Sequence, residues 1–336
     1  MSTHSPTRPT YQLILIGLLS SAFFSATFIM NYVMHLQGGH WAWSAALRFV
    51  FMLMLLFPFL LLAKGTAFMA QLFQVFFRNL VFWLIAGTIG FGVFYAGICY
   101  AADYSRGWLV AATWQSTVLA SPLVLVLFGM KMPTRGILLS VFIVLGVVLV
   151  NYAQFKQGVA TNDLLYGVIP VLISAFAYPI GNQLLNGAKT GSLKAVKKID
   201  STVLTSSAAC VLLMSLGSVP FWILLVLFVQ PPPPSAGQVY GSLSVALFSG
   251  VCATSLFYWA RNSTTSAMQI AAVDATLAGE VIVTLVAEML FLDQPAPDAL
   301  SIVGLVIITL GLIGYCYRSA ASVPEKPLVA IKGDAV

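Results

Sequence analysis

Charged residues are scarce in this sequence. Asp, Glu, Lys and Arg make up 8% of its 336 residues, whereas a soluble domain has about 25%. Hydrophobic residues make up 60%, and the mean hydropathy is +0.95. No water-soluble fold could cover so much apolar surface, so the composition excludes a soluble domain and predicts an integral membrane protein.

Cysteine and catalytic motifs are also lacking. The four cysteines each lie inside an apolar run, without metal-ligand spacing or the pattern of a disulfide framework. No Walker motif, HExxH or nucleophile elbow occurs. The stretch GTIGFG has glycines at 87, 90 and 92, but no strand–helix–strand unit surrounds it. We therefore expect no enzyme activity, ATP hydrolysis, metal or cofactor.

What the chain does have is long hydrophobic runs. Ten of them are long enough, or nearly so, to cross about 30 Å of hydrocarbon. We place the ten predicted spans at Leu13–Met34, Trp43–Ala63, Leu80–Ala101, Gly107–Phe128, Gly136–Tyr152, Leu164–Leu185, Val203–Phe228, Val239–Trp259, Met268–Phe291 and Leu300–Tyr317.

The basic residues orient these spans. With the N-terminus in the cytoplasm, 13 of the 16 Lys and Arg residues fall on inner segments, and only Arg106 and Lys156 fall outside. Arg48 lies within the second span. This asymmetry follows the positive-inside rule and predicts a multi-pass protein of the inner (plasma) membrane with both termini cytoplasmic. The net charge of +6 is thus a feature of topology and indicates no nucleic-acid partner.

The chain divides into two five-span units. We expect a cytoplasmic N-terminus (1–10), a first repeat (11–154), an extracytoplasmic linker (155–163), a second repeat (164–318) and a disordered cytoplasmic tail (319–336). The first span contains ATFIMN (Ala26–Asn31) and the sixth contains AYPIGN (Ala177–Asn182). Because five is odd, the second unit enters the membrane in the opposite sense. The predicted fold is therefore all-α, with ten transmembrane helices in two inverted five-helix repeats, a design common in transporters.

This layout resembles the drug/metabolite transporter superfamily in its ten-helix, two-repeat form. The resemblance rests on SAALRFVFML (Ser44–Leu53) in the second span and on two repeat ends, LFGMKMPTRGILLSVFIVLGVVLV and LFLDQPAPDALSIVGLVIITLGLIG. The multidrug-resistance efflux branch is the most similar. The chain departs from the family pattern at Met130–Lys131 and Asp293–Gln294, where a glutamate is usual. The family's proline is present in the fourth span as Pro122, but the matching region of the ninth span has Glu280 instead.

The ninth span holds three carboxylates, Asp274, Glu280 and Glu288. A charge at the bilayer centre costs about 3 kcal/mol on insertion scales, so each of them needs an explanation. Glu288 and Arg48 lie at similar depths in the outer half of the membrane. We predict that they form an ion pair with a structural or gating role, with Asp293 as the alternative acid. The other interpretation is an arginine that extends to the interface without a partner.

Glu280 lies near the midplane and has no cation at its depth. It could exchange a proton with water or lose it to a cationic substrate, which is the chemistry of proton antiport. Asp274 would be a second relay group or a cation-attracting residue of the cytoplasmic vestibule. For both acids a structural role remains an equal alternative, in which a neutral Glu280 donates a hydrogen bond.

Polar and aromatic residues in other spans are candidates for lining a substrate site. Trp114 and Gln115 lie in the fourth span, and an aromatic ring beside a carboxylate suits an organic cation. Tyr178, Asn31 and Asn182 are candidates for polar lining or hydrogen-bonded gates. For all of these residues, packing or hydrogen bonding between helices is the competing interpretation.

Three functions are compatible with these features. The first is a secondary active transporter that exports small organic compounds, drugs or cationic metabolites, by proton antiport with alternating access. The second is a carrier or exporter of amino acids or nucleotide-like metabolites, which an exposed Arg48 and a neutral Glu280 would favour. The third is a non-transporting scaffold or lipid-handling protein, which would have a solid interior.

The remaining expected partners are lipids and a second copy of the chain. The inner loop Gly187–Asp200 carries four lysines, and attraction to anionic lipid is the default explanation for such a segment. The sequence does not distinguish a monomer from a homodimer.

Overall fold

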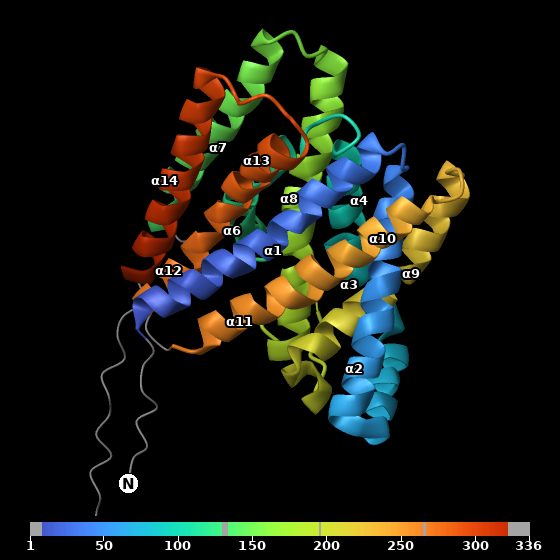
Figure 1. Ribbon diagram of the computed structural model, residues 1–336. Coiled ribbons are helices and arrows are strands. Elements are labelled where there is room, and N and C mark those ends of the chain that lie inside the picture. Colours follow the sequence, from blue (N-terminus) through green and yellow to red (C-terminus); the bar gives the residue numbers. More distant parts are fainter. Residues whose placement is uncertain (1–8, 130–133, 195, 265–266, 322–336) are drawn as a thin grey trace, which may run out of the picture.

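The structure of this chain is a computed structural model that describes residues 9–129, 134–194, 196–264 and 267–321. Every regular element within these ranges is a helix (Figure 1). Nine helices among the described residues are long and apolar enough to cross a membrane. The predicted all-α polytopic membrane fold is therefore confirmed. Residues 1–8 of the expected N-terminal segment, Met130–Lys131 and residues 322–336 of the expected tail lie outside the described ranges.

The predicted spans match the helices with small shifts at their ends. In chain order the helices are α1 (Thr10–Leu36), α2 (Trp41–Arg78), α3 (Leu80–Gly87), η1 (Thr88–Val93), α4 (Phe94–Ala101), α5 (Gly107–Trp114), α6 (Thr117–Leu127), α7 (Thr134–Lys156), α8 (Thr161–Thr190), η2 (Thr202–Thr205), α9 (Ser207–Val229), α10 (Ala236–Val245), η3 (Ala246–Ala253), α11 (Thr254–Asn262), α12 (Ala267–Ala275), η4 (Thr276–Ala278), α13 (Gly279–Phe291) and α14 (Ala299–Ala321).

The ninth predicted span consists of three consecutive segments. They are α12 with 9 residues, the 3-10 turn η4, and α13 with 13 residues. Neither α-helical segment alone is long enough to cross about 30 Å of hydrocarbon. The ninth predicted span is the one that is not among the nine long helices counted in the described ranges. Its interruption places Glu280 at the start of α13.

The second span continues into a helix that the sequence analysis did not anticipate. Gly65 has φ 81° and ψ 174°, a conformation that glycine adopts readily and other residues do not. The chain folds back at this point. The evidence is that the rings of Phe57 and Phe73, each eight residues from Gly65, lie 6.2 Å apart between centroids. Residues 66–78 therefore form a helix that returns beside the end of the second span.

Helical irregularities recur five spans apart. The third span contains the π-helix η1, and the eighth contains the π-helix η3. The fourth span is interrupted between α5 and α6, and the ninth is interrupted at η4. Such wide or tight turns inside membrane helices often mark functional positions.

The packing of the spans shows the same recurrence. The first span (α1) packs against the eighth and ninth through η3 and α13, and the sixth (α8) packs against the third and fourth through α4 and α6. The second and seventh spans (α2 and α9) pack together, as do the fifth and tenth (α7 and α14). Figure 1 shows α7 beside α14 on one side of the molecule and α2 beside α9 on the other. Adding five to each span number leaves these pairings unchanged.

The contact between α3 and α9 depends on a glycine. A Cβ atom on Gly217 would collide with the carbonyl oxygen of Trp83, which is backbone and cannot move aside cheaply. Small residues of this kind let membrane helices approach closely. The third and seventh spans are therefore held together by backbone proximity at this crossing.

We expect Gly217→Ala to destabilise the protein by about 1–3 kcal/mol, because an extra methyl group overpacks a close helix contact. The midpoint of thermal unfolding of the detergent-solubilised protein measures this. Gly314→Ala is the control, since its Cβ would lie 3.5 Å from the Leu139 side chain, an ordinary contact. Equal midpoints for the two variants would contradict the close approach of α3 and α9.

Candidate functional site

The helix α13 has one face toward the membrane and one toward the protein. Val286 and Leu290, four residues apart, are exposed. Glu280, Thr284 and Glu288, also spaced by four, are buried. Residues at this spacing share a helix face, and the buried face packs against α1 and α5. Both glutamates therefore point into the helix bundle and not toward lipid.

Glu280 is buried without a visible partner. Its side chain is 8% exposed, and its carboxyl group makes no hydrogen bond or ion pair among the residues that the structure describes. Its backbone carbonyl accepts the hydroxyl of Thr284 at 2.6 Å, which leaves the side chain uninvolved. The structure thus holds a carboxyl group inside the bundle whose hydrogen-bonding capacity is not used by the described part of the chain.

Glu288 has a specific backbone partner. Its side chain is 0% exposed, and its Oε1 accepts the backbone N–H of Trp108 at 3.0 Å. A Cβ on Gly107 would lie 2.5 Å from the same oxygen, so glycine provides the space for the carboxyl group. Trp108 lies in the first turn of α5, where free N–H groups and the helix dipole favour a negative charge. Glu288 therefore stabilises the start of the fourth span.

The predicted ion pair between Arg48 and Glu288 is not formed in the structure. The guanidinium carbon of Arg48 lies 4.1 Å from the ring centroid of Tyr95, a cation–π distance. The ion pairs among the described residues are His35–Asp103 and Lys198–Asp200, so neither Glu288 nor Asp293 pairs with Arg48. The physical reason is that both charges have other partners, namely an aromatic ring for the cation and a helix N-terminus for the anion.

Asn31 forms a hydrogen bond with Tyr95, whose ring contacts Arg48. Its Nδ2 donates to the Tyr95 hydroxyl at 3.1 Å, and the asparagine is 3% exposed. Arg48 itself is only half-buried, and its Nε is a buried donor without an acceptor. The first, second and third spans therefore meet in an Asn31–Tyr95–Arg48 cluster. Tyr95 was not singled out from the sequence, because an aromatic residue in a membrane helix carries no distinguishing signal.

Three aromatic rings converge between the third, fourth and sixth spans. The ring centroids of Phe94 and Trp114 are 5.1 Å apart, those of Phe94 and Tyr178 are 5.0 Å apart, and those of Trp114 and Tyr178 are 5.7 Å apart. We call these residues the aromatic cluster. Trp114 and Tyr178 were predicted to line a site, and the structure brings them together. Phe94, which begins α4 directly after η1, was missed.

Tyr178 is accessible on the bundle-facing side of α8. Phe176 and Ile173 line an apolar groove of about 520 Å³ on the other side of this helix. Tyr178 follows Phe176 by two residues, or about 200° around the helix, so it lies on the side of α8 that faces the bundle. A residue on that side would be expected to be buried, but Tyr178 is 37% exposed. Asn182, one turn further, is also exposed. Open space therefore reaches the interior side of α8 beside the aromatic cluster.

Gln115 and Glu280 lie at similar depths. Consecutive spans run in opposite directions, so the fourth and ninth spans are antiparallel, and Glu288 meets the fourth span at Gly107. Counting eight residues along each helix brings Glu280 (288 − 8) level with Gln115 (107 + 8). Gln115 is 4% exposed, and the neighbouring Ser116 hydroxyl is buried without a partner. Asp274 is half-buried, six residues before Glu280.

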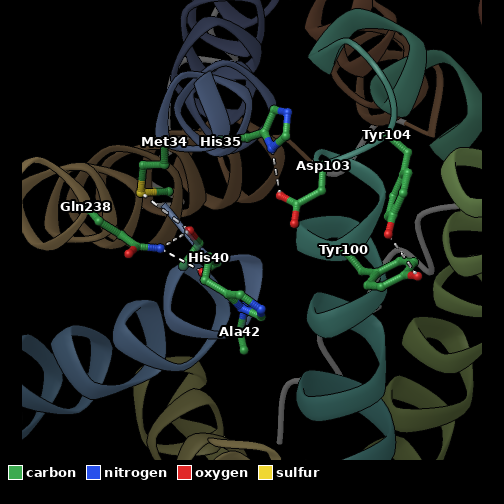
Figure 2. A network of polar contacts seen from close by, with 9 residues as sticks. Met34, His35, His40, Ala42, Tyr100, Asp103, Tyr104 and Gln238 are labelled. Carbon is green, nitrogen blue, oxygen red and sulfur yellow. Dashed lines mark hydrogen bonds and ion pairs between the residues drawn. The ribbon is translucent and has the colours of Figure 1, made fainter. Parts of the chain in front are cut away.

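One end of the bundle is closed by polar contacts (Figure 2). Gln238 of α10 is 2% exposed and donates to the His40 carbonyl oxygen at 2.7 Å and to the Ser44 hydroxyl at 2.9 Å. The Nδ1 atom of His35 lies 3.1 Å from a carboxylate oxygen of Asp103 at the same end. The Gln238 contacts join the eighth span to the start of the second span, and the His35–Asp103 contact joins the first span to the turn after the third. This end is the outer one in the predicted topology.

Comparison with known families agrees with this arrangement. The family described as "EmrE: Putative multidrug resistance efflux transporter" matches residues 11–321. The chain belongs to this family. The match includes all the helices that the structure describes except the first residue of α1, Thr10. It confirms the resemblance drawn from the sequence and places the protein among transporters.

Two curated proteins are similar to this chain. An uncharacterised protein, YjlA, of Bacillus subtilis (strain 168) is 37% identical over 332 residues, covering 93% of this chain and 97% of that protein. An uncharacterised 42.1 kDa protein of Shouchella clausii, from the 3′ region of an intracellular alkaline protease, is 36% identical over 265 residues, covering 75% of this chain and 65% of that protein. The similarity to YjlA extends over nearly the whole length of both chains.

We expect Arg48→Ala and Glu288→Ala to act independently, because the two side chains have separate partners. Their effects on the free energy of unfolding should add to within about 0.5 kcal/mol in the double variant. Denaturant titration of the purified single and double variants measures this. A coupling energy well above that limit would show that the two charges do pair.

Proposed function

We propose that this protein is a secondary active transporter that exports small organic compounds, drugs or cationic metabolites, in exchange for protons. The observation that carries the proposal is the buried Glu280 carboxyl group, which faces the bundle and has no partner among the described residues. An isolated carboxylate is costly inside a membrane. A proton or a cationic substrate would neutralise it, and the two would compete for the same group.

The aromatic cluster supports an organic cation as substrate. Phe94, Trp114 and Tyr178 present three rings within 5.0–5.7 Å of one another, and Tyr178 is reached by open space. Aromatic faces attract cations and also bury the apolar part of an organic molecule. The aromatic cluster would then bind the organic cation, and Glu280 would bind the proton that is exchanged for it. Trp114 is next to Gln115, which lies at the depth of Glu280.

The recurrence of the packing supports alternating access. Pairings that are unchanged by adding five to each span number are what two inverted five-helix repeats would produce. Two similar units can exchange conformations, which opens the site to one side and then to the other. In this proposal the contacts of Gln238 and the exposure of Tyr178 and Asn182 belong to a state closed at the outer end and accessible from the cytoplasm.

The charge distribution supports the location and orientation. Thirteen of sixteen basic residues lie on segments assigned to the cytoplasm. In this proposal the protein lies in the inner membrane with both termini in the cytoplasm, and it transports its substrate outward. Proton entry from outside would drive this export.

Arg48 favours a second candidate function. It is half-buried inside the bundle, and no carboxylate lies within ion-pair distance in the described part of the chain. A carrier of amino acids or nucleotide-like metabolites would use such a cation to hold an acidic group. A non-transporting scaffold is disfavoured, because the accessible side of α8 at Tyr178 faces the bundle.

We expect Glu280→Gln to abolish proton-driven transport, because glutamine cannot gain or lose a proton. The measurement is uptake of a fluorescent organic cation, ethidium, into liposomes containing the purified protein under an imposed pH gradient. Asp298→Asn is the matched control, since this acid lies in the loop before α14 and bonds to the backbone of Ser301. Full gradient-driven transport by Glu280→Gln would refute the coupling role.

We expect Trp114→Ala to raise the KM for ethidium about tenfold, corresponding to the loss of ~1.4 kcal/mol of cation–π contact and burial. The maximal rate should change less than KM. Phe228→Ala is the control, because this ring is 83% exposed on α9, away from the aromatic cluster. An unchanged KM in Trp114→Ala would remove the cluster from the substrate site.

A further inference from the structure

A polar pocket of about 680 Å³ lies outside the proposed transport site. One wall is the end of the helix formed by residues 66–78, and the other is the segment before α9. Its polar lining includes Gln71, Gln74, Arg78, Asn79, Lys197 and Lys198. The two walls are more than a hundred residues apart in the chain. The pocket belongs to the cytoplasmic side in the predicted topology.

The pocket has an excess of positive charge. Its lining contains three basic residues, Arg78, Lys197 and Lys198, and one acid, Asp200, for a net charge of +2 (3 − 1). Lys198 pairs with Asp200 at 2.6 Å. Arg78 and Lys197 have no ion pair with any described residue. An anion would therefore meet two unpaired cations and the side-chain amides of two glutamines and one asparagine.

Exposed apolar residues lie close in the chain to Arg78, one of the residues that line the pocket. Phe77 precedes Arg78 and is 66% exposed, and Val81 follows it by three residues and is 70% exposed. Phe73 and Phe77 extend this apolar surface along the helix, with ring centroids 6.4 Å apart. A soluble anion would make no use of such a surface, whereas a lipid has both a charged group and acyl chains. Cationic residues together with exposed apolar side chains therefore favour an anionic lipid over a soluble anion as the ligand.

We propose that this pocket binds the phosphate headgroup of an anionic phospholipid, with Arg78 and Lys197 on the phosphate and the acyl chains along Phe77 and Val81. Arginine can hold two phosphate oxygens at once, and lysine adds a point charge. Basic pockets on the cytoplasmic side of membrane proteins bind anionic headgroups in this way. Because the walls come from the helix 66–78, which follows the second span, and from the segment before the seventh span, a bound lipid would link the two halves.

The test is lipid binding by the purified full-length protein. The protein is titrated with phosphatidylglycerol in a phosphatidylcholine background, and bound lipid is measured by native mass spectrometry. We expect Arg78→Gln/Lys197→Gln to weaken phosphatidylglycerol binding about 30-fold, at about fivefold for each basic group near the membrane surface. The matched control, Lys64→Gln/Lys189→Gln, removes two basic groups on exposed positions outside the pocket and should bind nearly as the parent does.

Three results would overturn the proposal. Equal losses in the pocket and control variants would mean a diffuse surface attraction. Displacement of phosphatidylglycerol by millimolar inorganic phosphate would mean a site for a soluble anion. Unchanged binding in the pocket variant would mean that lipid binds elsewhere. If the double variant does not fold, Arg78→Lys replaces it, and a loss of about threefold is expected because lysine cannot hold two oxygens.

Discussion

The structure depends on one constraint, which is that polar groups inside hydrocarbon need partners from the protein itself. Most of the buried polar side chains follow it. Glu288 receives the N–H of Trp108, Asn31 bonds to Tyr95, and Gln238 bonds to His40 and Ser44. Each of these contacts joins two different spans. The polar residues therefore act as connections that set how the helices pack.

The Glu280 carboxyl group does not follow this constraint, because it has no partner among the described residues. Asn31, Gln238 and Glu288 each have a hydrogen-bond partner on another segment, so the fold is capable of pairing buried polar groups. The available carboxyl group next to an interrupted helix is the reason for proposing a transient ligand there. The irregular turns η1, η3 and η4 point the same way, because a regular helix would be more stable at those positions.

The membrane architecture could be predicted from the sequence, whereas much of the site could not. The spans are recognisable because 20 or so apolar residues have few other uses. Glu280 and Trp114 could be named as candidate site residues from their surroundings in the sequence. The partner of Glu288 could not be predicted, because every residue except proline has a backbone N–H and the sequence does not distinguish one such group from another. The Arg48 prediction failed for a related reason, since depth along a helix says nothing about which neighbour lies across from it.

The sequence by itself determined the multi-pass membrane class, the places of the apolar runs, the asymmetry of the basic residues and the positions of the intramembrane acids, because these follow from local composition and from the thickness of the membrane. Only the tertiary structure decided which charges meet. The bend at Gly65 and the convergence of Phe94, Trp114 and Tyr178 come from contacts between spans far apart in the chain. Helix rotation and crossing decide such contacts, and packing of the whole bundle sets both.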